Sequence, residues 1–146
     1  MDKKKIADVV MKLFLYGDVC KMIHYSTPKM HCHKLCDDVR DSITIFADDL
    51  AEKGFGITGK PEFSDFSLKL NITVSNDIAV VCQDVVNLVD ELRKEIAEDD
   101  KWSGIVSIID DFKAEMSQKI YLANFDGVST KKLDEAVRRA IKKILR

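Results

Sequence analysis

The stretch HCHKLCDDVRDSITIFADDLAEKG, residues 31–54, decides how this chain is interpreted. Within it, four chemically reactive side chains follow one another at spacings of four, eleven and four residues: His33, Asp37, Asp48 and Glu52. An α-helix turns through about 100° per residue, so eleven residues make roughly three full turns and all four side chains share one helical face. The first pair and the second pair then lie on the order of 16 Å apart along the helix axis.

This separation favours a site shared between two chains. One helix cannot bring both pairs onto one ion. Two copies packed antiparallel about a two-fold axis would place the first pair of each against the second pair of the other. The dimer would hold two identical carboxylate–imidazole sites, a ligand mixture that suits iron, manganese or zinc. A solvated charged face, or a polar dimer interface without metal, are the alternative interpretations.

The segment around this stripe resembles the second-helix signature of Dps proteins, the small ferritin-like iron-storage proteins of microbes. That signature is a His-aromatic pair, then His-x3-Asp, then Asp-x3-Glu with Ala before the Glu and Gly shortly after. The matching residues are His24-Tyr25, His33-x3-Asp37, Asp48-x2-Ala51-Glu52 and Gly54. A looser resemblance, in helix lengths and connection order, extends over residues 5–125.

The chain departs from the family pattern at its histidines. The gap from His24 to His33 is shorter than is usual in the family, and Tyr25 stands where the family usually has Trp. A third histidine, His31, is an alternative imidazole ligand. The carboxylate positions therefore match the family more closely than the imidazole positions do.

The resemblance implies a ferroxidase centre in which Asp48 and Glu52 of one subunit meet His24, His33 and Asp37 of its neighbour. Fe(II) would be oxidised there by peroxide or oxygen, with Tyr25 as an electron donor. The resemblance also implies a dodecameric cage, built from two-fold dimers, that stores ferric mineral and protects against oxidative damage. The alternative is a non-catalytic helical dimer or oligomer that binds DNA or a protein partner.

Apolar periodicity predicts an all-α chain with helices over 3–25, 28–53, 77–98, 103–125 and 130–145. Thr27 and Pro28 suit the start of the second helix, and Gly54 and Gly56 suit its end. The connection 54–76 is too long for antiparallel neighbours. It therefore favours a ferritin-like four-helix bundle with a crossover between helices two and three. Three aromatic residues are expected to anchor this connection: Phe55, Phe63 and Phe66.

A bundle over residues 1–127 is expected to precede a basic C-terminal helix over 128–146. Seven cations make residues 131–146 strongly positive: Lys131, Lys132, Arg138, Arg139, Lys142, Lys143 and Arg146. An apolar stripe on the opposite face is expected to dock on the protein: Leu133, Val137, Ala140, Ile141 and Ile144. The basic face is a candidate for DNA binding, because clustered cations match a phosphate backbone. A membrane surface is the less favoured partner.

The remaining composition fits one globular domain, with 46% hydrophobic and 33% charged residues among 146. No 18-residue apolar run and no signal-peptide pattern occur, so a cytoplasmic location is expected. The four cysteines are then expected to be free thiols, with Cys36 in the core. A zinc site at His31-Cys32-His33-x2-Cys36 lacks a second Cys/His pair to complete it.

Overall fold

The structure is a computed structural model that describes residues 1–67, 69, 71, 72, 74–125 and 130–145, with the side chains of 125 and 130–136 left out. This part of the chain contains no strand, and the predicted all-α class is confirmed. The helices are α1 (Lys3–Ser26), α2 (Met30–Thr58), α3 (Ile78–Ile96), α4 (Ser103–Phe125) and α5 (Thr130–Ile144). Two short 3₁₀ turns lie at η1 (Phe63–Asp65) and η2 (Asp100–Trp102). No helix in the described ranges is both long enough and apolar enough to cross a membrane.

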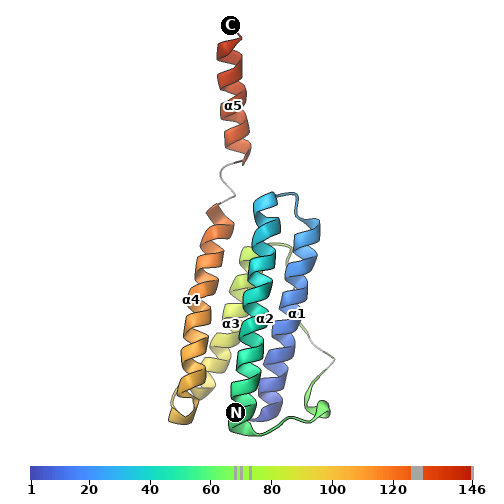
Figure 1. The fold of residues 1–146 in the computed structure, drawn as a ribbon, viewed down its shortest axis with the longest axis vertical. Helices are drawn as coiled ribbons and strands as arrows, with labels where there is room; N and C mark the ends of the chain where they lie inside the picture. Colours follow the sequence, from blue (N-terminus) through green and yellow to red (C-terminus); the bar gives the residue numbers. More distant parts are fainter. Residues whose placement is uncertain (68, 70, 73, 126–129, 146) are drawn as a thin grey trace.

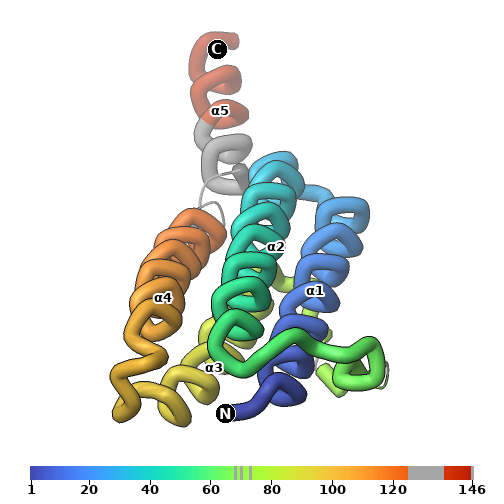
Figure 2. Tube along the Cα trace, turned by 60° about the horizontal axis from the view of Figure 1, so that its bottom comes forward, coloured from blue at the N-terminus to red at the C-terminus, as the bar shows by residue number. Residues whose placement is uncertain are grey.

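Helices α1 to α4 lie side by side (Figure 1). α1 packs on α2, α3 packs on α4, and the two pairs meet through α2 with α4 and α1 with α3. α1 and α4 end at the same end of the molecule at which α2 and α3 begin. α2 and α3 therefore run in the same direction, and the link over 59–77 returns along the helices. It leaves α2 beside the start of α1, as Figure 2 shows.

One apolar core fills the space between these four helices. The predicted stripe of α2 is buried in it: Leu35, Val39, Ile43, Phe46 and Leu50. Phe46 stacks on Phe112 of α4 with ring centroids 4.1 Å apart and an angle of 9° between the rings. Burial of each such side chain contributes about 1.5–3 kcal/mol. The core fixes α2 with one face inward, which leaves the face carrying the acidic stripe outward.

The end of α2 differs from the prediction. Gly54 does not end the helix but lies buried against Ile6 of α1, where an added Cβ would be 2.9 Å from Ile6 Cδ1. Gly56 does not end it either: α2 continues to Thr58 and is capped by Gly59, whose φ of 102° is a left-handed conformation that glycine adopts without steric cost. Gly54 therefore permits close helix packing, and Gly59 supplies the stop.

The start of α2 and the link also differ from the prediction. α2 begins at Met30, while Thr27 caps α1 by donating its N–H to the Ile23 carbonyl at 2.8 Å. Phe63 does not anchor the link, because it is 86% exposed at a short 3₁₀ turn. Phe55 and Phe66 do pack together, with ring centroids 6.1 Å apart.

α5 stands beyond the end of the four packed helices (Figure 1). The predicted docking of its apolar stripe is wrong for the described side chains: Val137, Ile141 and Ile144 are all exposed. The physical reason is that α5 stands beyond the four packed helices, so these three side chains remain uncovered by the described part of the chain. The side chains of Lys131, Lys132, Leu133 and Arg146 lie outside the described part.

Candidate functional site

The strongest candidate site lies where α1 meets α2, at His24 and His33. Their imidazole rings stack with centroids 3.6 Å apart and an angle of 24°. Nδ1 of each ring lies 2.7 Å from the backbone carbonyl oxygen of the other residue. A carbonyl oxygen can only accept, so each Nδ1 carries the proton and donates it. In the neutral form of each ring, Nε2 then keeps a lone pair that can bind a metal ion.

This reciprocal arrangement follows from the short turn between the helices. α1 ends at Ser26 and α2 begins at Met30, so residues 24 and 33 face each other across three residues of turn. The His24 carbonyl belongs to the last turn of α1, where carbonyls lack helical donors. The His33 ring supplies the missing donor, and the same contact holds both rings in fixed orientations.

Asp37 joins the pair from the next turn of α2. Its Oδ1 accepts a hydrogen bond from Lys21 Nζ at 3.0 Å and lies 3.3 Å from His24 Nδ1. The hydrogen bond from Lys21 is the main reason that the pKa of Asp37 lies below its ordinary value, with a smaller contribution from His24. The carboxylate is ionised at neutral pH. The Lys21 ammonium holds the place beside it that a metal cation would take.

Tyr25 borders this cluster on its outer side. Its ring meets His24 edge to face at 5.4 Å, and Lys21 Nζ lies 5.3 Å from its centroid. The ring is 76% exposed. The phenol is thus adjacent to the imidazole pair and open to solvent, or to a second protein chain.

Asp48 and Glu52 lie farther along the outward face of α2. Both are exposed, and neither makes a hydrogen bond or ion pair with any residue in the described ranges. Across those same ranges, no three His, Cys, Asp or Glu side chains converge closely enough to hold a metal ion. One chain therefore places Asp37 beside the stacked His24–His33 pair without forming a three-ligand metal site, and it leaves the second acidic pair apart.

His31 faces a different neighbour. Its Nε2 donates to the Leu122 carbonyl of α4 at 2.9 Å. On a helix, His31 lies about 200° around from His33. The structure thus places His31 in the packing between α2 and α4, away from the stacked pair.

The cysteines divide by burial. Cys20, Cys36 and Cys82 are fully buried in the core. Burial raises the pKa of the Cys36 thiol to about 11 and that of the Cys82 thiol to about 12. These thiols stay protonated at neutral pH and are poor nucleophiles, and the prediction that Cys36 is a core residue is confirmed. Cys32 is partly exposed.

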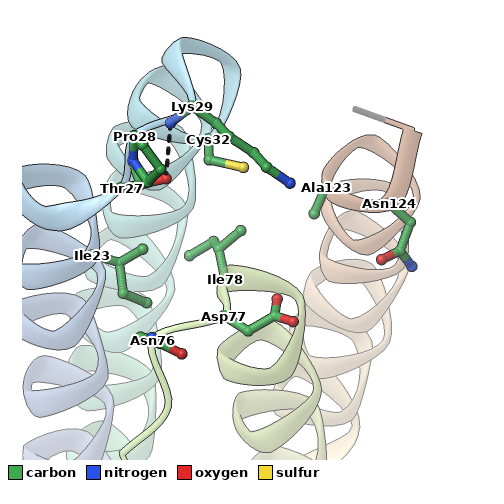
Figure 3. Close-up of a pocket in the computed structure, with 10 residues that line it drawn as sticks. All are labelled: Ile23, Thr27, Pro28, Lys29, Cys32, Asn76, Asp77, Ile78, Ala123 and Asn124. Carbon is green, nitrogen blue, oxygen red and sulfur yellow. Dashed lines mark hydrogen bonds between the residues drawn. The ribbon is translucent and has the colours of Figure 1, made fainter. Parts of the chain in front are cut away.

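A separate cavity of about 330 Å³ opens at the end of the molecule where the four helix ends meet (Figure 3). Thr27 Oγ1 accepts the Lys29 N–H at 3.3 Å, and the Asp77 carboxylate accepts the Ala79 N–H at 2.9 Å. The Thr27 and Asp77 side chains are therefore engaged as local caps, and the other polar residues that line the cavity are Lys29, Cys32, Asn76 and Asn124. None of the predicted metal ligands lines it. Sequence reasoning missed this cavity because its walls come from four distant segments.

Sequence reasoning also missed Lys21, which pairs with Asp37. Its position one turn before His24 on α1 was the available signal, since residues three apart share a helix face. The site thus contains an imidazole pair, one ionised carboxylate, a competing ammonium and a phenol. No protein-family model, curated protein or solved structure matches the chain.

Proposed function

We propose that this protein is a Dps-like ferroxidase and iron-sequestering protein that oxidises Fe(II) at sites shared between two subunits. The observation that carries the proposal is the His24–His33 pair, in which both Nδ1 atoms donate to carbonyls, so that both Nε2 atoms of the neutral rings would be available to a metal ion. Histidines that bind metals usually have their other ring nitrogen held in this way. The ionised Asp37 carboxylate, whose Oδ1 lies 3.3 Å from His24 Nδ1, would add a hard oxygen ligand.

The second half of the site would come from another copy of the chain. Asp48 and Glu52 are exposed, unpaired within the described ranges and on the same outward face of α2 as His33 and Asp37. An antiparallel pairing of two α2 helices would bring them to the imidazole pair of the neighbour. Each dimer would then have two equivalent sites.

Exposed apolar side chains at the same end of the molecule favour an interface with another subunit there. Met22 is 62% exposed and Met30 is 68% exposed; Met22 precedes His24 in the chain, and Met30 lies between the two histidines. Large apolar side chains left exposed at one end of a molecule are a feature of interaction surfaces. The parallel α2 and α3 with their long return link are also what a ferritin-like bundle with a crossover requires. We include that bundle and a cage of twelve subunits in the proposal.

The chemistry assigns a role to each group. Carboxylate oxygens favour Fe(III), the harder ion, over Fe(II), so they would drive oxidation forward. Two Fe(II) ions would each give one electron to hydrogen peroxide, which takes up two protons and becomes two water molecules. Binding of iron would displace Lys21 from Asp37, and Tyr25 would supply an electron to a reactive oxidant. Manganese or zinc would compete for the same ligands.

The test is Fe(II) oxidation, driven by air and by peroxide, in the wild type and in Asp48→Ala/Glu52→Ala. We expect the rate of Fe(II) oxidation to fall about tenfold or more in the double variant, while the protein remains helical. Glu91→Ala/Glu95→Ala is the matched control, since this exposed pair on α3 has the same four-residue spacing. Wild-type kinetics in the Asp48/Glu52 variant would contradict the assignment. Size exclusion on the same preparation distinguishes a cage near twelve times 16.6 kDa from a simple dimer.

A second candidate function is DNA binding through α5, which is the function expected of a non-catalytic interaction protein. The observation that favours it is the exposure of four cations there: Arg138, Arg139, Lys142 and Lys143. Phosphate contacts of this kind are independent of base sequence and fall steeply with salt. Iron oxidation and DNA binding would use different surfaces of the chain and are compatible.

A further inference from the structure

A groove of about 240 Å³ runs between α2 and α4, on a side of α2 next to the acidic stripe. Its floor is apolar, formed by the stacked rings of Phe46 and Phe112 with Ile108 beside them. Ile45 borders it and is 71% exposed. A large aliphatic side chain left this open beside an aromatic floor indicates a surface that another apolar group covers.

The rim of the groove is acidic. Asp49 contributes from α2, and Asp111 and Glu115 contribute from α4. Ser42 donates a hydrogen bond to Glu115, and Lys53 pairs with Asp49 from outside the groove. No basic side chain of the described part of the chain lines the groove itself. The surface therefore fits an occupant that is apolar along one face and basic along its edges.

The exposed helix α5 has this character. Val137, Ile141 and Ile144 are 49%, 49% and 81% exposed and recur at helical spacing. At about 100° per residue, Arg138 and Lys143 fall on opposite edges of this stripe, roughly 100° and 120° from its centre. Seating the stripe in the groove would bring these two cations to the two rims.

The lengths also match. The groove is lined from residue 42 to 49 on α2 and from 108 to 115 on α4. The exposed stripe runs from Val137 to Ile144. Each interval covers seven helical steps, about 10 Å of axis.

We propose that the α2/α4 groove is the docking site for α5 of a second copy of this chain. A second copy is favoured over the chain's own α5 because α5 stands beyond the end of the four packed helices (Figure 1), whereas the groove lies between α2 and α4. Exchange of an identical element between protomers is a low-cost route to assembly. The contact is made by side chains outside the proposed iron ligands and does not depend on them. Arg139 and Lys142 would still face outward.

Cross-linking of full-length chains tests the seating directly. Two differently tagged chains are mixed, one with Ile45→Cys and one with Ile141→Cys, both in a Cys32→Ser background that removes the partly exposed native thiol. We expect a disulfide that joins the two tags under mild oxidation. Val80→Cys replaces Ile45→Cys in the control, since Val80 is exposed on α3 away from the groove. Equal cross-linking in the control, or none with Ile45→Cys, overturns the proposal.

A single chain carrying both Ile45→Cys and Ile141→Cys decides between the two possible sources of α5. We expect disulfide formation in this chain to disappear when the protein is diluted before oxidation, because the contact joins two molecules. A disulfide that forms within one chain independently of concentration would mean that α5 folds back on its own groove, and the proposal is then wrong.

Charge reversal supplies an independent measurement by sedimentation. Arg138→Glu/Lys143→Glu should weaken self-association about five- to tenfold, and so should Asp111→Lys/Glu115→Lys. A mixture of the two variants should associate more tightly than either alone. Arg139→Glu/Lys142→Glu, with the same change in charge on the far side of α5, should have little effect. Equal weakening by both α5 variants would show a general charge effect and overturn the seating.

Discussion

The Nδ1 atoms of His24 and His33 each donate to the carbonyl oxygen of the other residue at 2.7 Å, which fixes the tautomer and orientation of both rings. The two helices are thereby joined at their common turn by a pair of side chains rather than by the turn alone. This arrangement makes each ring depend on the other for its position.

Substitution of the histidines distinguishes the role of the stacked pair from that of His31. His24→Ala and His33→Ala should each slow Fe(II) oxidation, and each should destabilise the fold by about 1–2 kcal/mol, because a carbonyl loses its donor. His31→Ala should cost a similar amount of stability, since it leaves the Leu122 carbonyl without its donor. It should leave oxidation unchanged. A large loss of rate in His31→Ala alone would move the imidazole assignment to that residue.

Removal of the ammonium at position 21 should change the titration of Asp37. In Lys21→Met, the pKa of Asp37 should rise toward its ordinary value, because the hydrogen bond that lowers it is lost. A depressed carboxyl pKa stabilises the native state above the unfolded pKa and ceases to do so as pH falls through the native value. The stability that the wild type has over Lys21→Met should therefore be largest near neutral pH and vanish in acid. NMR titration of the Asp37 carboxyl and unfolding at several pH values measure both.

The same variant bears on metal binding. Because Lys21 occupies the place of a cation beside Asp37, its removal should increase the affinity for Zn²⁺ used as a redox-inert probe. Unchanged affinity would mean that Asp37 is not a ligand.

Substitution of two glycines of α2 by alanine should change the free energy of unfolding in opposite directions. Gly54→Ala should destabilise the fold by about 1–3 kcal/mol, because the new Cβ overlaps a buried β-branched side chain, Ile6. Gly56→Ala is the control: it meets nothing within 4 Å and should stabilise by up to about 1 kcal/mol through helix propensity. Urea unfolding of both variants gives the comparison. A stabilised Gly54→Ala would show that α1 and α2 are not in close contact there.

Thiol reactivity should follow burial. Ellman's reagent should modify Cys32 first in the native protein, and Cys20, Cys36 and Cys82 only on unfolding, since those three are inaccessible and remain protonated at neutral pH. Cys32→Ser should remove the early phase and leave the other three thiols for the denatured chain. Fast reaction of a second thiol in the folded protein would contradict the packing of the core.

Truncation of the C-terminal helix tests the DNA hypothesis. The full chain should shift duplex DNA at about 50 mM salt and release it as salt rises, because counterions are released on binding. Deletion of residues 130–146 should abolish the shift and spare Fe(II) oxidation. Binding that survives the deletion would place the DNA surface elsewhere on the molecule.

The sequence by itself determined the helices and their inner faces. The 3.6-residue periodicity of apolar side chains is a local property, so it predicted α1, α3 and α4 closely and placed Phe46 and Leu50 in the core. The spacing of Asp37, Asp48 and Glu52 likewise determined that one face of α2 is acidic, whatever the rest of the chain does.

Only the tertiary structure decided which of these groups meet. The contact of His24 with His33 depends on the path of the turn between two helices, and that of Lys21 with Asp37 depends on how α1 and α2 are rotated against each other. Glycine is a residue type that often ends helices, yet Gly54 is a packing residue because Ile6 of α1 occupies the space beside it. The exposure of α5 depends on the direction in which it leaves α4. Periodicity describes one helix at a time, and contacts between helices depend on all of them together.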